Sequence, residues 1–245
     1  MKGLPFTQVI FLFLAAAIAG TLNAVAGGGS FVSFPALLFV RVPAVAANAT
    51  NTVALWPGLA ASTVAYMRRL NAPPRLLVPL LVTSVAGGWV GALLLLRTPQ
   101  RTFLHLVPWL LLAGTLLFAF GNSIRTIAGK TAVRDDLHAT SSTAILVTSL
   151  VELLVAIYGG YFGAGIGFIT LGMLTALGMR DIHAMGAIRT LLAATINAAA
   201  VLTFILAGAV LWPQCVVMIA GAPWPAAGLE RTTPRKPIPG KSEPW

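Results

Sequence analysis

Long apolar stretches separated by short polar connections make up most of this chain. A helix needs about 20 consecutive, mostly apolar residues to span a membrane. By this measure the pattern predicts an all-α, polytopic membrane protein with about seven spans. The predicted helices cover residues 7–26, 45–66, 76–96, 102–120, 143–161 and 182–206, and a last one begins near residue 210.

Glycine-rich runs interrupt two of these apolar stretches. The first run lies within GTLNAVAGGGSFVSFPALLFV (Gly20–Val40) and the second within YGGYFGAGIGFITLGMLTAL (Tyr158–Leu177). A short half-helix is predicted after each break, over residues 30–40 and 166–178. Backbone in contact with lipid cannot leave its N–H and C=O groups unpaired, so a broken helix is stable at membrane depth only where it lines a protein cavity. Two such breaks in matching positions of two halves indicate the substrate site of a transporter.

The two halves of the chain resemble each other weakly. Three pairs of segments occur in the same order at a nearly constant offset, which is the signature of an internal repeat. The pairs are Ser30–Val32 with Gly167–Ile169, Thr52 with Thr190, and Val85–Gly88 with Ile219–Ala222. We therefore expect a first transmembrane repeat over residues 1–120, a connecting loop over 121–142 and a second, incomplete repeat over 143–221. Parallel and inverted arrangements of the repeats are both left open.

The repeat breaks off near the C-terminus. In the first half the chain continues as an apolar helix to Leu96, whereas in the second half Ala222 is followed by PWPAAGLERTTPRKPIPGKSEPW. Prolines at this density forbid a helix interior, so residues 222–245 form a Pro-rich polar tail. The tail is interpreted either as a genuine disordered segment or as the result of a frame shift that removed an eighth span. The second interpretation is favoured, because the composition changes in the middle of an apolar helix.

Composition supports the membrane class and limits the partners. Of the 245 residues, 58% are hydrophobic and only 9% are charged, against roughly 25% charged in ordinary soluble domains. The net charge of +10 comes mainly from basic residues in short connections, a distribution typical of membrane loops and not of a nucleic-acid interface. Counting these loop charges places the side that carries Lys2, Arg68 and Arg69 in the cytoplasm. Cys215 is the only cysteine, which excludes an intrachain disulfide.

The N-terminus permits a different interpretation. Lys2, an apolar run and then Ala24-Val25-Ala26 fit a signal peptide with a small-residue cleavage site. We reject this interpretation because the second glycine-rich copy lies in the middle of the chain.

Several of these motifs resemble the TauE/SafE sulfite exporter family. The resemblance rests on Asn23 with Gly27-Gly28-Gly29-Ser30, on Asn48-Ala49-Thr50-Asn51-Thr52, and on GAGIGF at Gly163–Phe168, and it covers about residues 7–221. It implies a multi-pass permease of the inner (cytoplasmic) membrane in two repeated halves. It also implies a substrate among sulfite, organosulfonates and other small sulfur-containing anions. The chain departs from the family at its end, where a terminal span would be expected.

An anion site is expected between the two breaks. The half-helices that begin near Ser30 and Gly167 would direct their N-terminal N–H groups and positive dipole ends into the cavity. Arg189 lies about two turns inside a predicted span, and its planar fork of donors suits an oxyanion; snorkelling or an ion pair are the alternatives. The predicted substrate-binding residues are Asn23, Gly27, Gly28, Gly29, Ser30, Asn51, Thr52, Gly163, Gly165, Gly167, Arg189, Thr190 and Asn197.

Other interpretations compete for some of these residues. The asparagines and threonines could instead pair backbone groups freed at the breaks, and glycines could serve close helix packing, which we prefer for Gly87, Gly88 and Gly91. Glu152 is the only acid in a predicted span. It is a proton-coupling candidate, with an ion pair to Arg189 or another structural role as the alternative.

No enzyme, metal or cofactor chemistry stands out. The histidines (His105, His138 and His183) lack metal-ligand spacing, and no nucleotide-binding loop or Ser–His–Asp order is present. The tryptophans at 56, 89, 109 and 212 are interpreted as ordinary membrane aromatics. An intramembrane enzyme would need paired acids within the spans.

The expected function is secondary transport of a small anion, sulfite or an organosulfonate, across the cytoplasmic membrane. The expected partners are this anion and the lipid bilayer, without nucleic acid, and the oligomeric state is left open. A truncated, non-transporting membrane protein or scaffold subunit is the alternative.

The coding DNA just downstream of the Ala222 codon tests the origin of the tail. We expect an apolar span to reappear there in a neighbouring reading frame, because the repeat calls for one. If neither alternative frame encodes an apolar segment, the tail is genuine.

Overall fold

The computed structural model describes residues 4–25, 28–67, 70, 72–112, 115–116, 142–176, 179 and 181–222. Within these residues the chain is helical and contains no strand, so the predicted all-α class is confirmed. The predicted connecting loop up to residue 141 and the Pro-rich tail from residue 223 onward lie outside the described residues.

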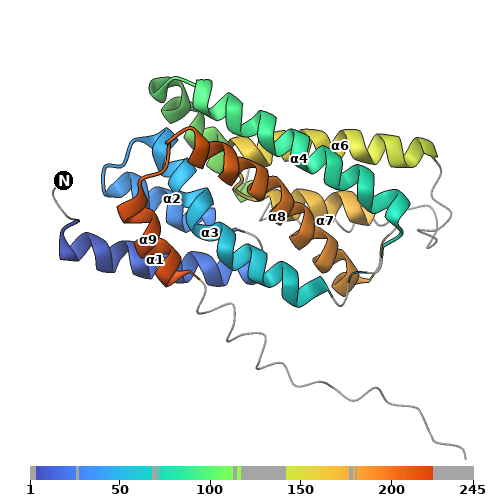
Figure 1. Cartoon of the computed structure of the whole chain (residues 1–245), viewed down its shortest axis with the longest axis horizontal. Coiled ribbons are helices and arrows are strands. Elements are labelled where there is room, and N and C mark those ends of the chain that lie inside the picture. Colours follow the sequence, from blue (N-terminus) through green and yellow to red (C-terminus); the bar gives the residue numbers. More distant parts are fainter. Residues whose placement is uncertain are drawn as a thin grey trace, which may run out of the picture.

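Each labelled helix begins within two residues of its predicted start. Residues 100–112 are helical as well. The labelled helices are α1 (Phe6–Val25), α2 (Ser30–Phe39), α3 (Ala44–Tyr66), α4 (Pro74–Arg97), α6 (Ser142–Tyr161), α7 (Ile166–Ala176), α8 (Ile182–Leu206) and α9 (Trp212–Gly221), as Figure 1 shows.

Three of the described helices are long and apolar enough to cross a membrane, over Phe6–Asn23, Pro74–Arg97 and His183–Leu206. Helix α3 has 23 residues, but it carries buried polar residues in its first turns, including Asn48 and Asn51. Shorter apolar helices, α2, α7 and α9 among them, complete the described part. The total of about seven spans remains a prediction.

The helices pack in two groups (Figure 1). The α1 group consists of α1, α2, α3 and α9, and the α4 group consists of α4, α6, α7 and α8. The main contact between the groups is that of α3 with α8. Helix α4 therefore packs on helices that follow it in the chain, namely α6 and α8, while α9 packs back on α1 and α3.

The helix pairs of one group mirror those of the other. Helix α1 pairs with α9, α2 and α3, and correspondingly α6 pairs with α4, α7 and α8. Likewise α3 contacts α2 and α9, as α8 contacts α7 and α4. Exchanging α1, α2, α3 and α4 for α6, α7, α8 and α9 thus converts one set of pairs into the other.

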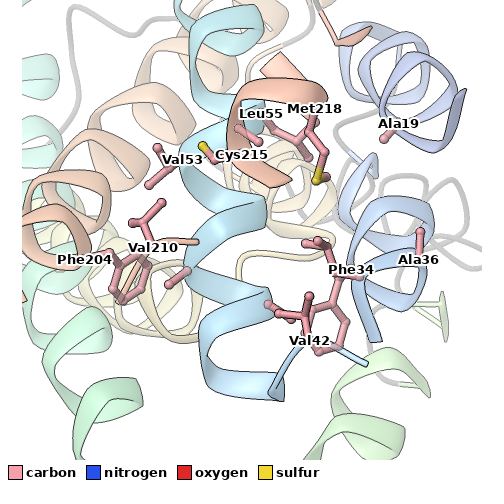
Figure 2. Close-up of a cluster of buried hydrophobic side chains, with 14 of the residues drawn as sticks. Ala19, Phe34, Ala36, Val42, Val53, Leu55, Phe204, Val210, Cys215 and Met218 are labelled. Atoms are coloured by element: carbon pink, nitrogen blue, oxygen red, sulfur yellow. The ribbon is translucent and has the colours of Figure 1, made fainter. Parts of the chain in front are cut away.

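Apolar side chains fill the α1 group around α3. Figure 2 shows side chains from α1, α2, α3, α8 and α9 gathered there, with Phe34, Cys215 and Met218 completely buried. Inside a bilayer the surrounding lipid is as apolar as these side chains, so van der Waals fit and not exclusion from water holds the helices together.

Glycines bring α4 close to α6 and α8. A Cβ atom added to Gly87 would lie 2.5 Å from the Cβ of Ala156, and one added to Gly88 would lie 2.5 Å from the carbonyl oxygen of Ile196. Gly91 likewise faces the backbone of α6. The packing interpretation of these three glycines is therefore confirmed. At the aligned position in α9, a Cβ on Gly221 would lie 2.5 Å from the carbonyl oxygen of Phe13 in α1.

Gly87→Ala tests this close approach. Because the new methyl group would overlap α6, we expect the free energy of unfolding to fall by about 1–3 kcal/mol, measured by thermal unfolding in detergent. Gly186→Ala is the matched control, since no heavy atom lies within 4 Å of its added Cβ. The control should gain about 0.4–1 kcal/mol, and equal stability of the two variants would contradict the prediction.

Candidate functional site

The first break separates α1 from α2. Residues 28–29 are not helical, and Gly27 lies outside the described residues. A Cβ on Gly29 would overlap the carbonyl oxygen of Ala19 and lie 3.1 Å from the Cβ of Asn23, while one on Gly28 would lie 3.3 Å from the ring of Phe31. Gly28 and Gly29 therefore allow the chain to turn tightly beside α1.

The second break separates α6 from α7. Gly163 and Gly165 adopt φ angles of +79° and +81°, a region that favours glycine because side chains with a Cβ are strained there. The backbone freed by the break is partly paired. The hydroxyl of Tyr158 donates to the carbonyl of Ala164 at 2.7 Å, and the N–H of Phe162 donates to the carbonyl of Tyr158 at 2.9 Å.

A cavity of about 40 Å³ with a mixed polar and apolar lining lies between the α1 group and the α4 group. A single water needs roughly 10–15 Å³ by the same measure. Both half-helices begin at this cavity, α2 with Ser30 and α7 with Ile166 and Gly167. The N–H groups of Phe31, Val32 and Ser33 bond to the carbonyls of Gly28 and Gly29, and that of Phe168 bonds to Gly165. The starts of two helices, which carry partial positive charge, therefore lie at one cavity.

Eight of the thirteen predicted substrate-binding residues line the cavity. They are Asn23, Ser30, Thr52, Gly163, Gly167, Arg189, Thr190 and Asn197. Asn51 lies just behind them, because its Nδ2 donates to the Oγ of Ser30 at 3.1 Å. Gly28, Gly29 and Gly165 shape the breaks without lining the cavity.

Several lining side chains bond to their own helices. The hydroxyl of Thr52 donates to the carbonyl of Asn48 at 2.9 Å, and that of Thr190 donates to the carbonyl of Gly186 at 2.7 Å. The amide of Asn197 likewise donates to the carbonyl of Ala193. Side-chain donors still available for a ligand therefore come from elsewhere in the lining, above all from Arg189.

Arg189 makes no ion pair with the acids of the described part of the chain. That part holds two acids, and each is engaged elsewhere. One Glu152 oxygen accepts from the hydroxyl of Ser84 at 2.7 Å, and the other has no hydrogen-bond partner. Asp181 accepts from the N–H of His183 at 2.8 Å. The ion pair considered for Glu152 and Arg189 is therefore wrong, because Glu152 faces α4.

The polar segment Asn48–Thr52 of α3 connects the two breaks. The amide of Asn48 donates to the carbonyl of Tyr161, the last residue of α6, at 3.0 Å. One turn later, Asn51 binds Ser30 at the start of α2. Between them, Thr50 accepts from the N–H of Leu211 just before α9. This segment therefore fixes both breaks relative to one helix.

The prediction missed the apolar wall of the cavity. Trp56 lines it, and its indole N–H donates to the carbonyl of Ala194 in α8 at 3.1 Å. The other tryptophans that the structure describes, Trp89, Trp109 and Trp212, are exposed. Leu55, Leu59, Ile166 and Ala193 complete the lining. The spacing of Thr52, Leu55, Trp56 and Leu59 places them on one helix face, which is a signal that the sequence contained.

This arrangement defines a polytopic helical membrane protein with a partly polar cavity between two broken helices. Residues 12–227 match the family model for the sulfite exporter TauE/SafE. The chain belongs to the TauE/SafE family, and the family prediction is confirmed.

Curated relatives agree with this assignment. The chain is 31% identical to a probable membrane transporter protein ORF9 of Sinorhizobium sp., over 90% of this chain and 81% of that protein. It is 28% identical to a probable membrane transporter protein of Haemophilus influenzae, over 86% and 79%. It is 27% identical to the probable membrane transporter protein YfcA of Escherichia coli K12, over 86% and 75%. No solved structure matches the chain. The protein is thus a multi-pass membrane transporter.

A double-mutant cycle of Asn51→Ala and Ser30→Ala tests the bond between α3 and the first break. We expect a coupling of about 0.5–1.5 kcal/mol in the free energy of unfolding, the usual net contribution of one hydrogen bond. Asn48→Ala paired with Ser30→Ala is the control and should be additive, because Asn48 binds Tyr161. Additivity of the Asn51 pair would show that the bond does not form.

Proposed function

We propose that this transporter moves a small sulfur-containing oxyanion, sulfite or an organosulfonate, across the cytoplasmic membrane. The observation that carries the proposal is Arg189, a guanidinium without an acid partner among the described residues, on a cavity at which two half-helices begin. The family and the named relatives support transport. The chemistry of the lining supports an oxyanion, and the description of the family supports sulfite.

The lining suits an oxyanion on electrostatic grounds. A helix end carries roughly half a positive charge, so the starts of α2 and α7 add to the full charge of Arg189. Hydrogen bonds to charged groups each contribute about 1.5–3 kcal/mol. The three oxygens of a sulfite or sulfonate group can accept the planar fork of Arg189 and a helix N–H at the same time. The apolar wall with Trp56 strengthens these interactions by excluding water.

Alternating access would occur between the α1 group and the α4 group. Their main contact is α3 with α8, and the cavity lies at that contact. The unit that moves is therefore a packing group, in which α4 and α9 have exchanged places, and not a continuous half of the sequence. The mirrored helix pairs and the equivalent places of Thr52 and Thr190 in the lining support the two predicted repeats.

Arg189→Ala tests the proposal. In the wild type, sulfite or methanesulfonate at about 100 times its Kd should stabilise the folded protein by about 2.7 kcal/mol. The variant should bind about ten- to a hundredfold more weakly, because one charge-assisted contact is lost, and its transport in proteoliposomes should fall with normal folded yield. Arg189→Lys should also weaken binding, since the bidentate fork is lost.

Arg97→Ala is the matched control, because Arg97 is exposed at the end of α4. It should leave anion binding unchanged. Loss of folded yield in Arg189→Ala would assign a structural role to the arginine. A wild type that shows no anion-dependent stabilisation would favour the scaffold alternative.

A further inference from the structure

Glu152 is a buried acid that lies apart from the anion cavity. It sits in α6, is 0% exposed and is absent from the cavity lining. Its carboxyl faces α4, where Ser84 donates to Oε1 at 2.7 Å. The second oxygen, Oε2, is buried without a hydrogen-bond partner. Nothing in the anion site uses this group.

No counter-charge neutralises this carboxyl within the described residues. The helices packed against α6 are α4, α7 and α8, and α7 carries no titratable side chain. Apart from Glu152, α6 carries Tyr158 and Tyr161, whose hydroxyls donate to Ala164 and Thr98. Helix α4 carries Arg75 and Arg97, which are exposed at its two ends. Helix α8 carries His183, exposed at its start, and Arg189, which lines the cavity. An unpaired carboxylate in an apolar interior is very costly, so the neutral acid is the form compatible with this packing.

We propose that Glu152 is the proton-carrying site of the transport cycle. The inference rests on the proposed function and adds the coupling ion to it. In the packing observed, Glu152 holds its proton and accepts the bond from Ser84. Release transfers the proton from the carboxyl to water that enters between α4 and α6, which leaves a carboxylate still bonded to the Ser84 hydroxyl and a hydronium ion in the entering water.

The α4–α6 contact next to Glu152 controls the entry of that water. Gly87 follows Ser84 by one turn, and Ala156 follows Glu152 by one turn. These two residues are in direct contact, since a Cβ on Gly87 would lie 2.5 Å from that of Ala156. The close packing that keeps the acid dry is therefore the packing that must loosen to release its proton.

Helix α8 links the proton site to the anion site. It packs against both α4 and α6, and it carries Arg189 and Thr190 in the cavity lining. A shift of α8 on anion binding would change the packing around Glu152, and protonation of Glu152 would in turn favour one position of α8. This mutual effect is what coupling between two sites requires.

Glu152→Gln in proteoliposomes is the test, with the purified full chain, radiolabelled sulfite as the probe and a pH-sensitive dye inside the vesicles. In the wild type, an imposed pH gradient should drive uphill sulfite movement, accompanied by proton movement. In Glu152→Gln both should be lost. Sulfite exchange at equal pH and sulfite-induced thermal stabilisation should remain, because the anion site is intact. If Glu152 had a purely structural role, Glu152→Gln would not abolish gradient-driven transport while leaving sulfite exchange and sulfite-induced stabilisation intact.

Two serines refine the test. Ser84→Ala should shift the pH at which transport is half-maximal, since Ser84 positions the carboxyl. Ser149→Ala is the matched control, because Ser149 is also buried in α6 and its hydroxyl has no hydrogen-bond partner; its pH profile should match the wild type. If Glu152→Gln fails to fold, the Ser84 variant decides, and an unchanged pH profile then overturns the proposal.

The outcomes separate this inference from the proposed function. Sulfite transport by the wild type without proton movement overturns the role of Glu152 and leaves the anion site standing, as does gradient-driven transport by Glu152→Gln. A wild type that neither binds nor moves sulfite or methanesulfonate overturns the proposed function, and this inference with it.

Discussion

The need to pair every backbone polar group inside a membrane governs this structure. A helix that stops and restarts in lipid would leave N–H and C=O groups without partners. Here the groups freed at the second break are met by Tyr158 and by the amide of Asn48, and both breaks lie against α3. At the starts of α2 and α7 the N–H groups of Phe31, Val32, Ser33 and Phe168 bond to glycine carbonyls of the breaks, and both helix starts lie at the cavity. Both broken helices are thus placed where protein, and not lipid, surrounds the interrupted backbone.

Much of the fold was predictable because membrane helices are constrained in length and composition. Apolar runs located the helices, and the glycine runs located both breaks. Arg189 and the polar residues near the breaks could be assigned to a common site because a charge in an apolar span is costly and usually faces a cavity or a partner. The structure brings eight predicted residues to one cavity. These successes all rest on contrast between polar and apolar residues.

The features that the sequence did not predict involve residues that do not differ in polarity from their neighbours or carry no distinctive pattern. Trp56 and Leu55 line the cavity, yet in a membrane helix apolar residues face lipid, protein or cavity alike. The ion pair considered for Glu152 was wrong because the orientation of α6 depends on its packing with α4. Ser84, the actual hydrogen-bond partner, is a serine that nothing in the sequence distinguishes from others. The exchange of α4 and α9 between the groups could not be predicted either. Small residues such as Gly87 and Gly221 permit close helix contact, but they do not indicate which helix makes it.

That exchange affects how the protein must be made. Helix α1 packs against α9, and α4 packs against α6 and α8. Because α6, α8 and α9 are synthesised later, α1 and α4 enter the bilayer before the helices against which they pack. Until then the faces of α1 and α4 that these later helices cover are open to lipid or to wrong partners. The packing of α1 and α4 can therefore be completed only after α6, α8 and α9 have been inserted.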